Sequence, residues 1–130
     1  MVRVFVRDTS SSIGWTQQGS DIIGDASGDL FGFTIALSSD GNILVAGALY
    51  GNSDDSGYVK VYKRDTSSPI GWSQLGGKIS GAESDDRSSL AVDVSGDGLL
   101  IGIGSYTNDD GGEDAGHVRL FNEIYQVFSL

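Results

Sequence analysis

Short apolar runs alternate along the chain with clusters of Gly, Asp, Asn and Ser, a pattern that predicts short β-strands joined by tight turns. Within one stretch of the chain we expect four strands, at 31–38, 42–48, 57–63 and 71–79. The Ser-Asp-Gly triplet at 39–41 separates the first two, and Asp-Gly tolerates the positive φ angles of a hairpin turn. The period-two alternation and the density of turns exclude a helical solenoid.

The pattern itself repeats along the chain. Residues 2–24 align with residues 59–81 without a gap, which gives a period of 57 residues. A third copy opens at Gly116, where GHVRLF matches GYVKVY at 57–62 after a two-residue insertion around 108–115. The chain therefore holds two full periods and part of a third.

A four-stranded unit of this length is typical of a β-propeller blade. The sequence predicts an all-β fold, a partial β-propeller of about two to two and a half four-stranded antiparallel blades. We expect a half blade of two strands in 1–30, a first full blade in 31–87 and a second blade in 88–130, whose last strand departs from the repeat. A propeller needs about four to eight blades, so a homo-oligomer or a longer parent chain must complete the ring. The excerpt of a longer chain is the interpretation we favour.

Charge narrows the classes of partner. The chain has 18 acidic and 8 basic residues and a formal net charge of −10. Such a chain repels nucleic acid and anionic lipid and favours cationic partners and divalent ions. Without Cys, a disulfide or a thiolate metal site is excluded. No apolar stretch approaches the ~18 residues of a membrane helix, and the opening VRVFVRD has no signal-peptide pattern.

One family resemblance covers nearly the whole chain. Phe31-Gly32, TIALSSDGNILVAGA, an acidic loop and GYVKVYKRD resemble the FG-GAP repeat of integrin-α-like β-propellers. The segments GWTQQGSDI and GWSQLGGKI are similar to large marine repeat proteins whose blades carry a Gly-Trp strand. The resemblance implies an extracellular or cell-surface module for binding or adhesion, with an unknown protein or glycan ligand.

The same family often holds calcium in its first hairpin, within a loop of spaced side-chain oxygens. In the second repeat Asp93, Ser95 and Asp97 keep three of these positions, but Ile101 stands where the closing carboxylate is expected. The first repeat has Ala36 in place of the first Asp. The resemblance thus implies a degenerate calcium site at Asp93, Ser95 and Asp97. The alternative is that these Ser and Asp side chains make local turn hydrogen bonds.

Two other acidic clusters, in 25–29 and 108–114, are candidates for a cation or for simple solvation. Trp15 and Trp72 occupy identical repeat positions, which predicts packing between blades; a sugar-stacking platform is the alternative.

For catalysis the sequence offers little. His117 is the single His and stands where the preceding repeat has Tyr58, an interchangeable strand position. No nucleophile motif or phosphate-binding loop occurs, so we predict no catalytic residue, no organic cofactor and no enzyme activity. Three functions stay open: a non-catalytic binding or adhesion module, a purely structural repeat of a large surface protein, and a propeller-based hydrolase.

Overall fold

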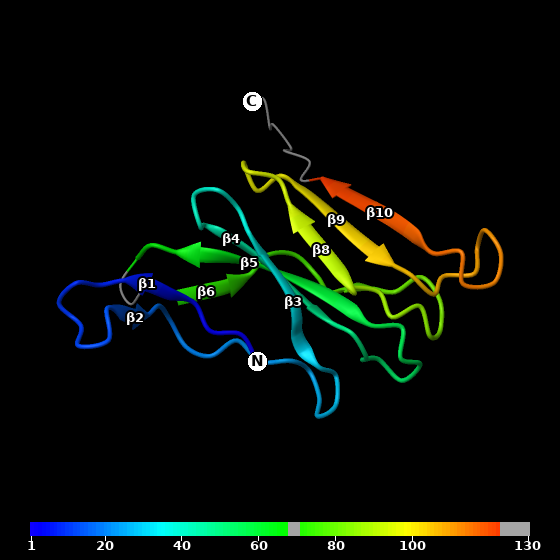
Figure 1. The fold of residues 1–130 in the computed structure, drawn as a ribbon, viewed down its shortest axis with the longest axis horizontal. Helices are drawn as coiled ribbons and strands as arrows, with labels where there is room; N and C mark the ends of the chain where they lie inside the picture. Colours follow the sequence, from blue (N-terminus) through cyan, green and yellow to red (C-terminus); the bar gives the residue numbers. More distant parts are fainter. Residues whose placement is uncertain (68–70, 123–130) are drawn as a thin grey trace, which may run out of the picture.

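The fold contains only strands as regular elements within residues 1–67 and 71–122, the part of the chain that this computed structural model describes (Figure 1). The strands form three antiparallel sheets. The first sheet pairs β1 (Phe5–Arg7) with β2 (Trp15–Gln17). The third sheet has the order β10-β9-β8, formed by β8 (Ala91–Val94), β9 (Leu100–Ser105) and β10 (His117–Asn122).

The middle sheet has five strands in the order β3-β4-β5-β6, with β7 also pairing with β5. Their bounds are β3 (Phe31–Leu37), β4 (Ile43–Ala48), β5 (Tyr58–Asp65), β6 (Gly71–Gln74) and β7 (Ile79–Ser80). The expected strands at 31–38, 42–48 and 57–63 are thereby confirmed. The prediction of one strand over 71–79 is wrong, because Gly76 has a φ of 71° and interrupts it. The predicted strand in 123–130 lies outside the described residues.

The 57-residue period is visible in the strand registers. Phe5 pairs with Gln17 in the first sheet as Tyr62 pairs with Gln74 in the middle one. The isolated bridge between Val2 and Ile22 recurs as the pairing of Val59 with Ile79. The first sheet therefore has the geometry of the outer strands of the middle sheet.

The third sheet follows the same rule on the other side of the insertion. Ser105 pairs with His117 as Ala48 pairs with Tyr58, so the offset is 57 residues before the loop and 59 after it. The two-residue insertion between β9 and β10 is thus confirmed, and His117 occupies the strand position of Tyr58.

The sheets pack face to face around the two buried faces of β4. Leu44, Ala46 and Ala48 belong to a core cluster that includes the Val2–Ile22 bridge beside the first sheet. Its other members are Phe31, Tyr58 and Tyr62. Val45 points to the opposite face, as alternation in a strand requires. It belongs to a second cluster with Val59, Val61, Val94, Ile101 and Ile103, which joins the middle and third sheets.

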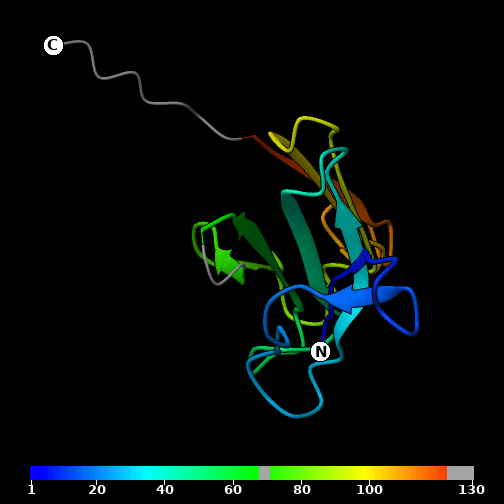
Figure 2. The ribbon, with the colours of Figure 1, turned by 90° about the vertical axis from the view of Figure 1, so that its left-hand side faces the viewer.

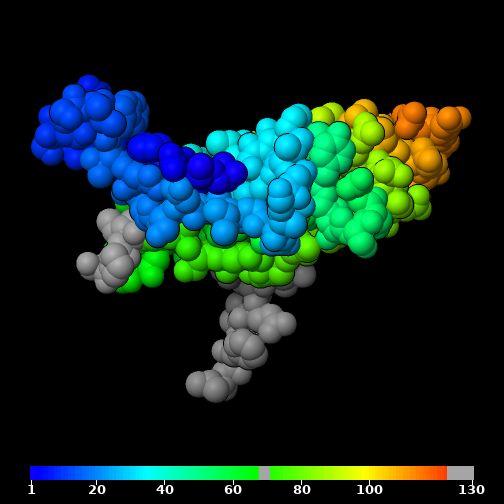
Figure 3. All heavy atoms as spheres, turned by 90° about the horizontal axis from the view of Figure 1, so that it is seen from below, coloured from blue at the N-terminus to red at the C-terminus, as the bar shows by residue number. Residues whose placement is uncertain are grey.

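The views agree with this arrangement. In Figure 2 the blue pair β1–β2 is nearest the viewer, in front of β3. Figure 3 shows the N-terminal residues (blue) at one end of the molecule and the loop of the third sheet (orange) at the other. The third sheet covers one face of the middle sheet, and the N-terminal segment covers part of the other face. On that second face Phe33, Ile35 and Leu37 of β3 are 51%, 53% and 48% exposed.

Candidate functional site

Four loops lie at the same end of the sheets, where β3, β5, β8 and β10 begin and β4 and β9 end. We call them the acidic rim; they span 24–30, 49–57, 81–90 and 106–116. They contain 11 of the 18 Asp and Glu residues and one basic residue, Arg87. The antiparallel topology gathers these carboxylates from loops that are far apart in the sequence.

Hydrogen bonds tie neighbouring loops of the rim together. The backbone amide of Asp85 donates to the carbonyl of Asp54 at 3.0 Å, and that of Ser88 donates to the carbonyl of Ser56 at 2.8 Å. The hydroxyl of Thr107 donates to the carbonyl of Asp85 at 2.7 Å. The rim is therefore a connected surface rather than four independent loops.

Two buried carboxylates anchor the rim at corresponding repeat positions. Asp29 is 7% exposed and accepts hydrogen bonds from the Tyr58 hydroxyl at 2.8 Å and the Ala26 amide at 3.0 Å. Burial raises the pKa of Tyr58 well above its ordinary value, so its hydroxyl keeps the proton that it donates. The predicted cation cluster in 25–29 thus includes a carboxylate with a structural role.

The second anchor uses a different donor. Asp86 is 1% exposed and accepts hydrogen bonds from the Glu83 amide at 2.9 Å and from the Asn108 side chain at 3.2 Å. Asn108 stands 57 residues after Gly51, and the Tyr58 ring lies beside the Gly51 backbone. The Asn108 side chain therefore occupies the corresponding space in the next repeat and takes the role of the Tyr58 hydroxyl. The sequence signal for this pair is that Asp29 and Asp86 occupy the same repeat position. That alignment does not indicate that the two carboxylates are buried.

Compensating charge is concentrated at one end of the rim. Lys60 and Lys78 both pair with Asp25, and the hydrogen bond from Lys60, followed by that from Lys78, lowers the pKa of Asp25. Both ammonium groups also lie over the Tyr58 ring. Within residues 1–67 and 71–122, no Lys or Arg pairs with a carboxylate of the loops 49–57, 81–90 and 106–116. These three loops carry the uncompensated negative charge.

A hollow of about 480 Å³ opens within the rim. Its lining residues include Asp29, Tyr50, Asn52 and Asp55. This combination of acceptors beside an aromatic face suits an ammonium or guanidinium group.

The predicted calcium loop lies at the opposite end of the sheets. Asp97 Oδ1 accepts hydrogen bonds from the Ser95 hydroxyl at 2.6 Å and the Leu99 amide at 3.0 Å, and these bonds lower its pKa. The same bonds recur one repeat earlier, where Asp40 Oδ1 accepts from Ser38 and Asn42 at 2.7 and 2.9 Å. The turn hydrogen bonds that were the alternative to calcium are therefore present.

Asp93 takes no part in that turn. It lies in β8, and its Oδ1 accepts from the Val94 amide at 2.8 Å. Calcium takes about six to eight oxygen ligands, so the two carboxylates and one hydroxyl of Asp93, Ser95 and Asp97 fall short of a complete donor set. No group of three or more His, Cys, Asp or Glu suited to a metal ion occurs within the described part of the chain. Calcium binding there stays a prediction.

The Trp residues of the repeat differ in their surroundings. Trp72 is half-buried against the core cluster that includes the Val2–Ile22 bridge, and packing between propeller blades stays a prediction. Trp15, its counterpart in the first sheet, is 51% exposed. The difference follows from position: another sheet faces β6, while the described residues place none in front of β2.

His117 has polar neighbours that the sequence did not indicate. Its Nδ1 lies 3.6 Å from Asp110 Oδ2, and its strand partner is Ser105. Ser105 Oγ and His117 Nε2 are buried without a hydrogen-bond partner, so no bond links this hydroxyl to the imidazole. A nucleophile activated by a general base needs that bond, at least in the reactive complex.

No long apolar helix that could cross a membrane occurs in residues 1–67 and 71–122. Comparison with protein-family models, with curated proteins and with solved structures finds no match to the chain.

Proposed function

We propose that this chain is a non-catalytic binding module of a β-propeller of the FG-GAP kind, at the cell surface, and that its acidic rim binds a cationic protein segment. The observation that carries the proposal is the gathering of 11 of 18 acidic residues on four hydrogen-bonded loops at one end of the sheets. Carboxylates without a paired cation attract positively charged partners and set the orientation of encounter.

The stacked sheets support the propeller part of this proposal. Three sheets share one repeat, and apolar clusters join the middle sheet to the third sheet and to the N-terminal segment beside the first. In such a scaffold the strands are committed to the sheet ladder, so binding falls to the connecting loops. The hollow beside Asp29 and Asp55 offers a place for a Lys or Arg side chain of the partner.

The test is a calorimetric titration of the protein with a short peptide rich in Lys and Arg. We expect saturable binding that weakens at least tenfold between about 0.1 and 1 M salt, where the screening length falls from ~10 to ~3 Å. A variant with Asn or Gln at Asp109, Asp110, Glu113 and Asp114 loses most of the affinity. The matched control, which neutralises Asp40, Asp65, Asp93 and Asp97 outside the rim, has the same net charge and keeps it.

Equal weakening in both variants would contradict the rim as the binding surface, because net charge alone would then explain the affinity. Failure to bind the peptide, combined with binding to uncharged sugars on a glycan array, would assign the module to glycans instead.

A purely structural repeat is the second candidate, and the recurrence of the same turns and registers in successive repeats favours it. It predicts no ligand in either experiment. A propeller-based hydrolase is the third function considered; it predicts turnover on a substrate panel that is lost when one specific carboxylate is replaced.

A further inference from the structure

The outer face of the third sheet carries large apolar side chains that are exposed to solvent. Val118 is 71% exposed and Leu120 68% exposed. Their counterparts in the middle sheet are Val59 and Val61, which are 0% and 6% exposed because the third sheet covers them. The same positions of one repeat are thus core in one sheet and surface in the next.

One row of residues shows what covers the middle sheet. Thr34, Gly47 and Val59 are neighbours across β3, β4 and β5. Ser89 lies directly on this row: its Cβ is 2.5 Å from where a Cβ on Gly47 would be. The Thr34 hydroxyl donates to the Ser89 carbonyl at 2.7 Å, and the Ser89 hydroxyl donates to the Ala48 carbonyl at 2.8 Å.

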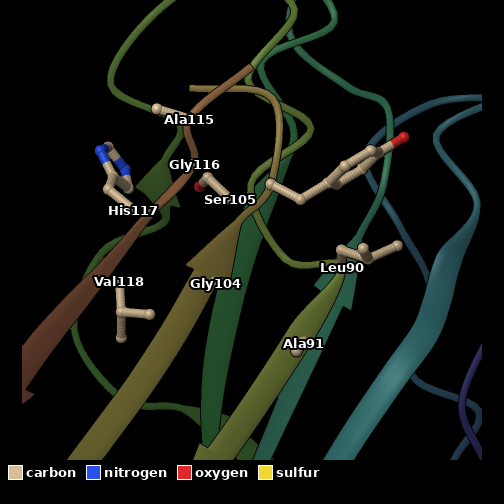
Figure 4. A pocket seen from close by; sticks show the side chains of 9 residues that line it. Leu90, Ala91, Gly104, Ser105, Ala115, Gly116, His117 and Val118 are labelled. Atoms are coloured by element: carbon tan, nitrogen blue, oxygen red, sulfur yellow. The ribbon is translucent and has the colours of Figure 1, made fainter. Parts of the chain in front are cut away.

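The corresponding row of the third sheet is uncovered. Ala91, Gly104 and Val118 are neighbours across β8, β9 and β10, and Figure 4 shows Gly104 between the other two. A hollow of about 390 Å³ lies along this row, with Leu90 and the loop residues Ala115 and Gly116 in its walls. Its place on the third sheet corresponds to the place that Ser89 fills on the middle sheet.

We propose that the outer face of the third sheet is the docking surface for a further sheet of the same 57-residue repeat. The partner needs a small residue at the position of Ser89, set against Gly104, with a hydroxyl that donates to the Ser105 carbonyl. It needs aliphatic residues at the positions of Val94, Ile101 and Ile103 to cover Val118 and Leu120. Ala91 stands at the repeat position of Thr34 and has no hydroxyl. The carbonyl of the partner's residue at the position of Ser89 therefore receives no hydrogen bond from this side chain.

A second copy of this chain does not supply such a sheet. The counterpart of Ser89 in the middle sheet is Gly32, which already lies against Met1 and Val2 of its own chain. The first sheet contains only the counterparts of the outer strands, so it has nothing to set against Gly104. The proposal therefore commits to a complete further repeat.

Asp93 is the charged residue of this face, and it constrains the partner. Its counterpart Ala36 packs at the border of the interface and is half-buried rather than buried. The partner must leave the Asp93 carboxylate in contact with water or place a hydrogen-bond donor beside it.

The experiment uses single cysteines, since the chain has none of its own. Val118→Cys is compared in the natural chain and in an extended chain in which a second copy of residues 64–130 follows Asn122. This junction keeps the period because Asn122 pairs with Leu100 as Lys63 pairs with Ile43. We expect the extended chain to slow the reaction of the thiol introduced by Val118→Cys with a thiol reagent at least 100-fold.

Three controls fix the interpretation. Val59→Cys reacts slowly in both chains, and Ser53→Cys, on an exposed loop, reacts fast in both. Gly104→Val in the first copy restores fast labelling of the Val118→Cys thiol in the extended chain, because its Cβ blocks the added serine. The same change is harmless in the natural chain, where an added Cβ on Gly104 meets only Ala91 atoms at 3.7 Å.

An unchanged labelling rate of the Val118→Cys thiol in the extended chain overturns the proposal. So does protection of that thiol in the unextended chain that grows with protein concentration, because a second copy would then be the occupant. This proposal rests on the propeller part of the proposed function. Neither result bears on what the acidic rim binds, since the carboxylates of the rim lie on the loops, whereas Val118 and Leu120 lie on β10.

Discussion

The middle and third sheets are built from one repeat, yet their equivalent strand faces meet different surroundings. Residues at the positions of Val59 and Val61 are core in the middle sheet, whereas Val118 and Leu120 are surface in the third. The side-chain type at each position follows the repeat, and its burial follows the presence of a neighbouring sheet. The repeat position of an apolar residue therefore does not by itself decide whether that residue is buried.

Between the two sheets, the largest difference in the effect of a substitution on the free energy of unfolding is expected at equivalent glycines. Gly57 and Gly116 have φ angles of 73° and 72°, so the left-handed strain of Gly→Ala is the same in both. A Cβ on Gly57 would lie 2.3 Å from the Ser88 carbonyl in the loop that leads into the third sheet, while the closest atoms to one on Gly116 are at 3.2 Å. We expect Gly57→Ala to lower the free energy of unfolding by about 3 kcal/mol and Gly116→Ala by about 1 kcal/mol.

Urea unfolding monitored by Trp fluorescence measures both variants. Equal losses would mean that the third sheet does not press on Gly57, which would remove the contrast between a covered and an uncovered sheet.

A smaller difference in the free energy of unfolding is expected at a position where both repeats have the same side chain. Val59→Ala removes two buried methyl groups and should cost about 2 kcal/mol, whereas Val118→Ala should stay within about 0.5 kcal/mol. The midpoint of chemical unfolding measures both. A loss above about 1 kcal/mol for Val118→Ala would show that this face is already covered in solution.

Substitutions in the hairpin turns should have equal effects on stability in the two sheets, because the hydrogen bonds of their Asp side chains lie within each turn. Asp40 and Asp97 close their turns with the same pair of hydrogen bonds, so Asp40→Ala and Asp97→Ala should lower the free energy of unfolding by the same small amount in the presence of a chelator. Calcium binding through Asp93, Ser95 and Asp97 would add a calcium-dependent loss for Asp97→Ala only. Unfolding in calcium and in chelator distinguishes these outcomes.

The smallest expected effect is a pH dependence at the β1–β2 and β5–β6 turns. The Ser10 hydroxyl, then that of Thr16, lowers the pKa of Asp8 from 3.8 to about 2. Its counterpart Asp65 has a pKa lowered by Ser67, with no second hydroxyl contributing among residues 1–67 and 71–122. A lowered folded-state pKa stabilises the fold above the unfolded value and loses that effect as the pH falls towards the folded value.

Asp8 should therefore titrate below Asp65, and its turn should weaken between about pH 4 and 2. Carboxyl-carbon NMR measures both values, and Thr16→Val should raise the pKa of Asp8 towards that of Asp65. An unchanged pKa of Asp8 in this variant would contradict the role given to the Thr16 hydroxyl.

Several parts of the fold and site could be predicted from local chemistry. Alternating apolar positions indicated the strands, and Asp-Gly pairs indicated the hairpins. The break between β6 and β7 was missed because Gly76 bends a segment whose residues otherwise suit a strand. Of the candidate site, the acidic loops were visible as clusters, but their union into one rim was not, since it depends on which strand ends lie together.

The sequence by itself determined the repeat, its 57-residue period and the strand positions, because these depend on spacing and turn residues within one segment. The tertiary structure decided which equivalent residues are buried, that Asp29 and Asp86 anchor the rim, and that Ser105 and His117 are strand partners. The physical reason is that burial and hydrogen-bond partners come from neighbouring sheets, and a linear pattern does not state which sheets are neighbours.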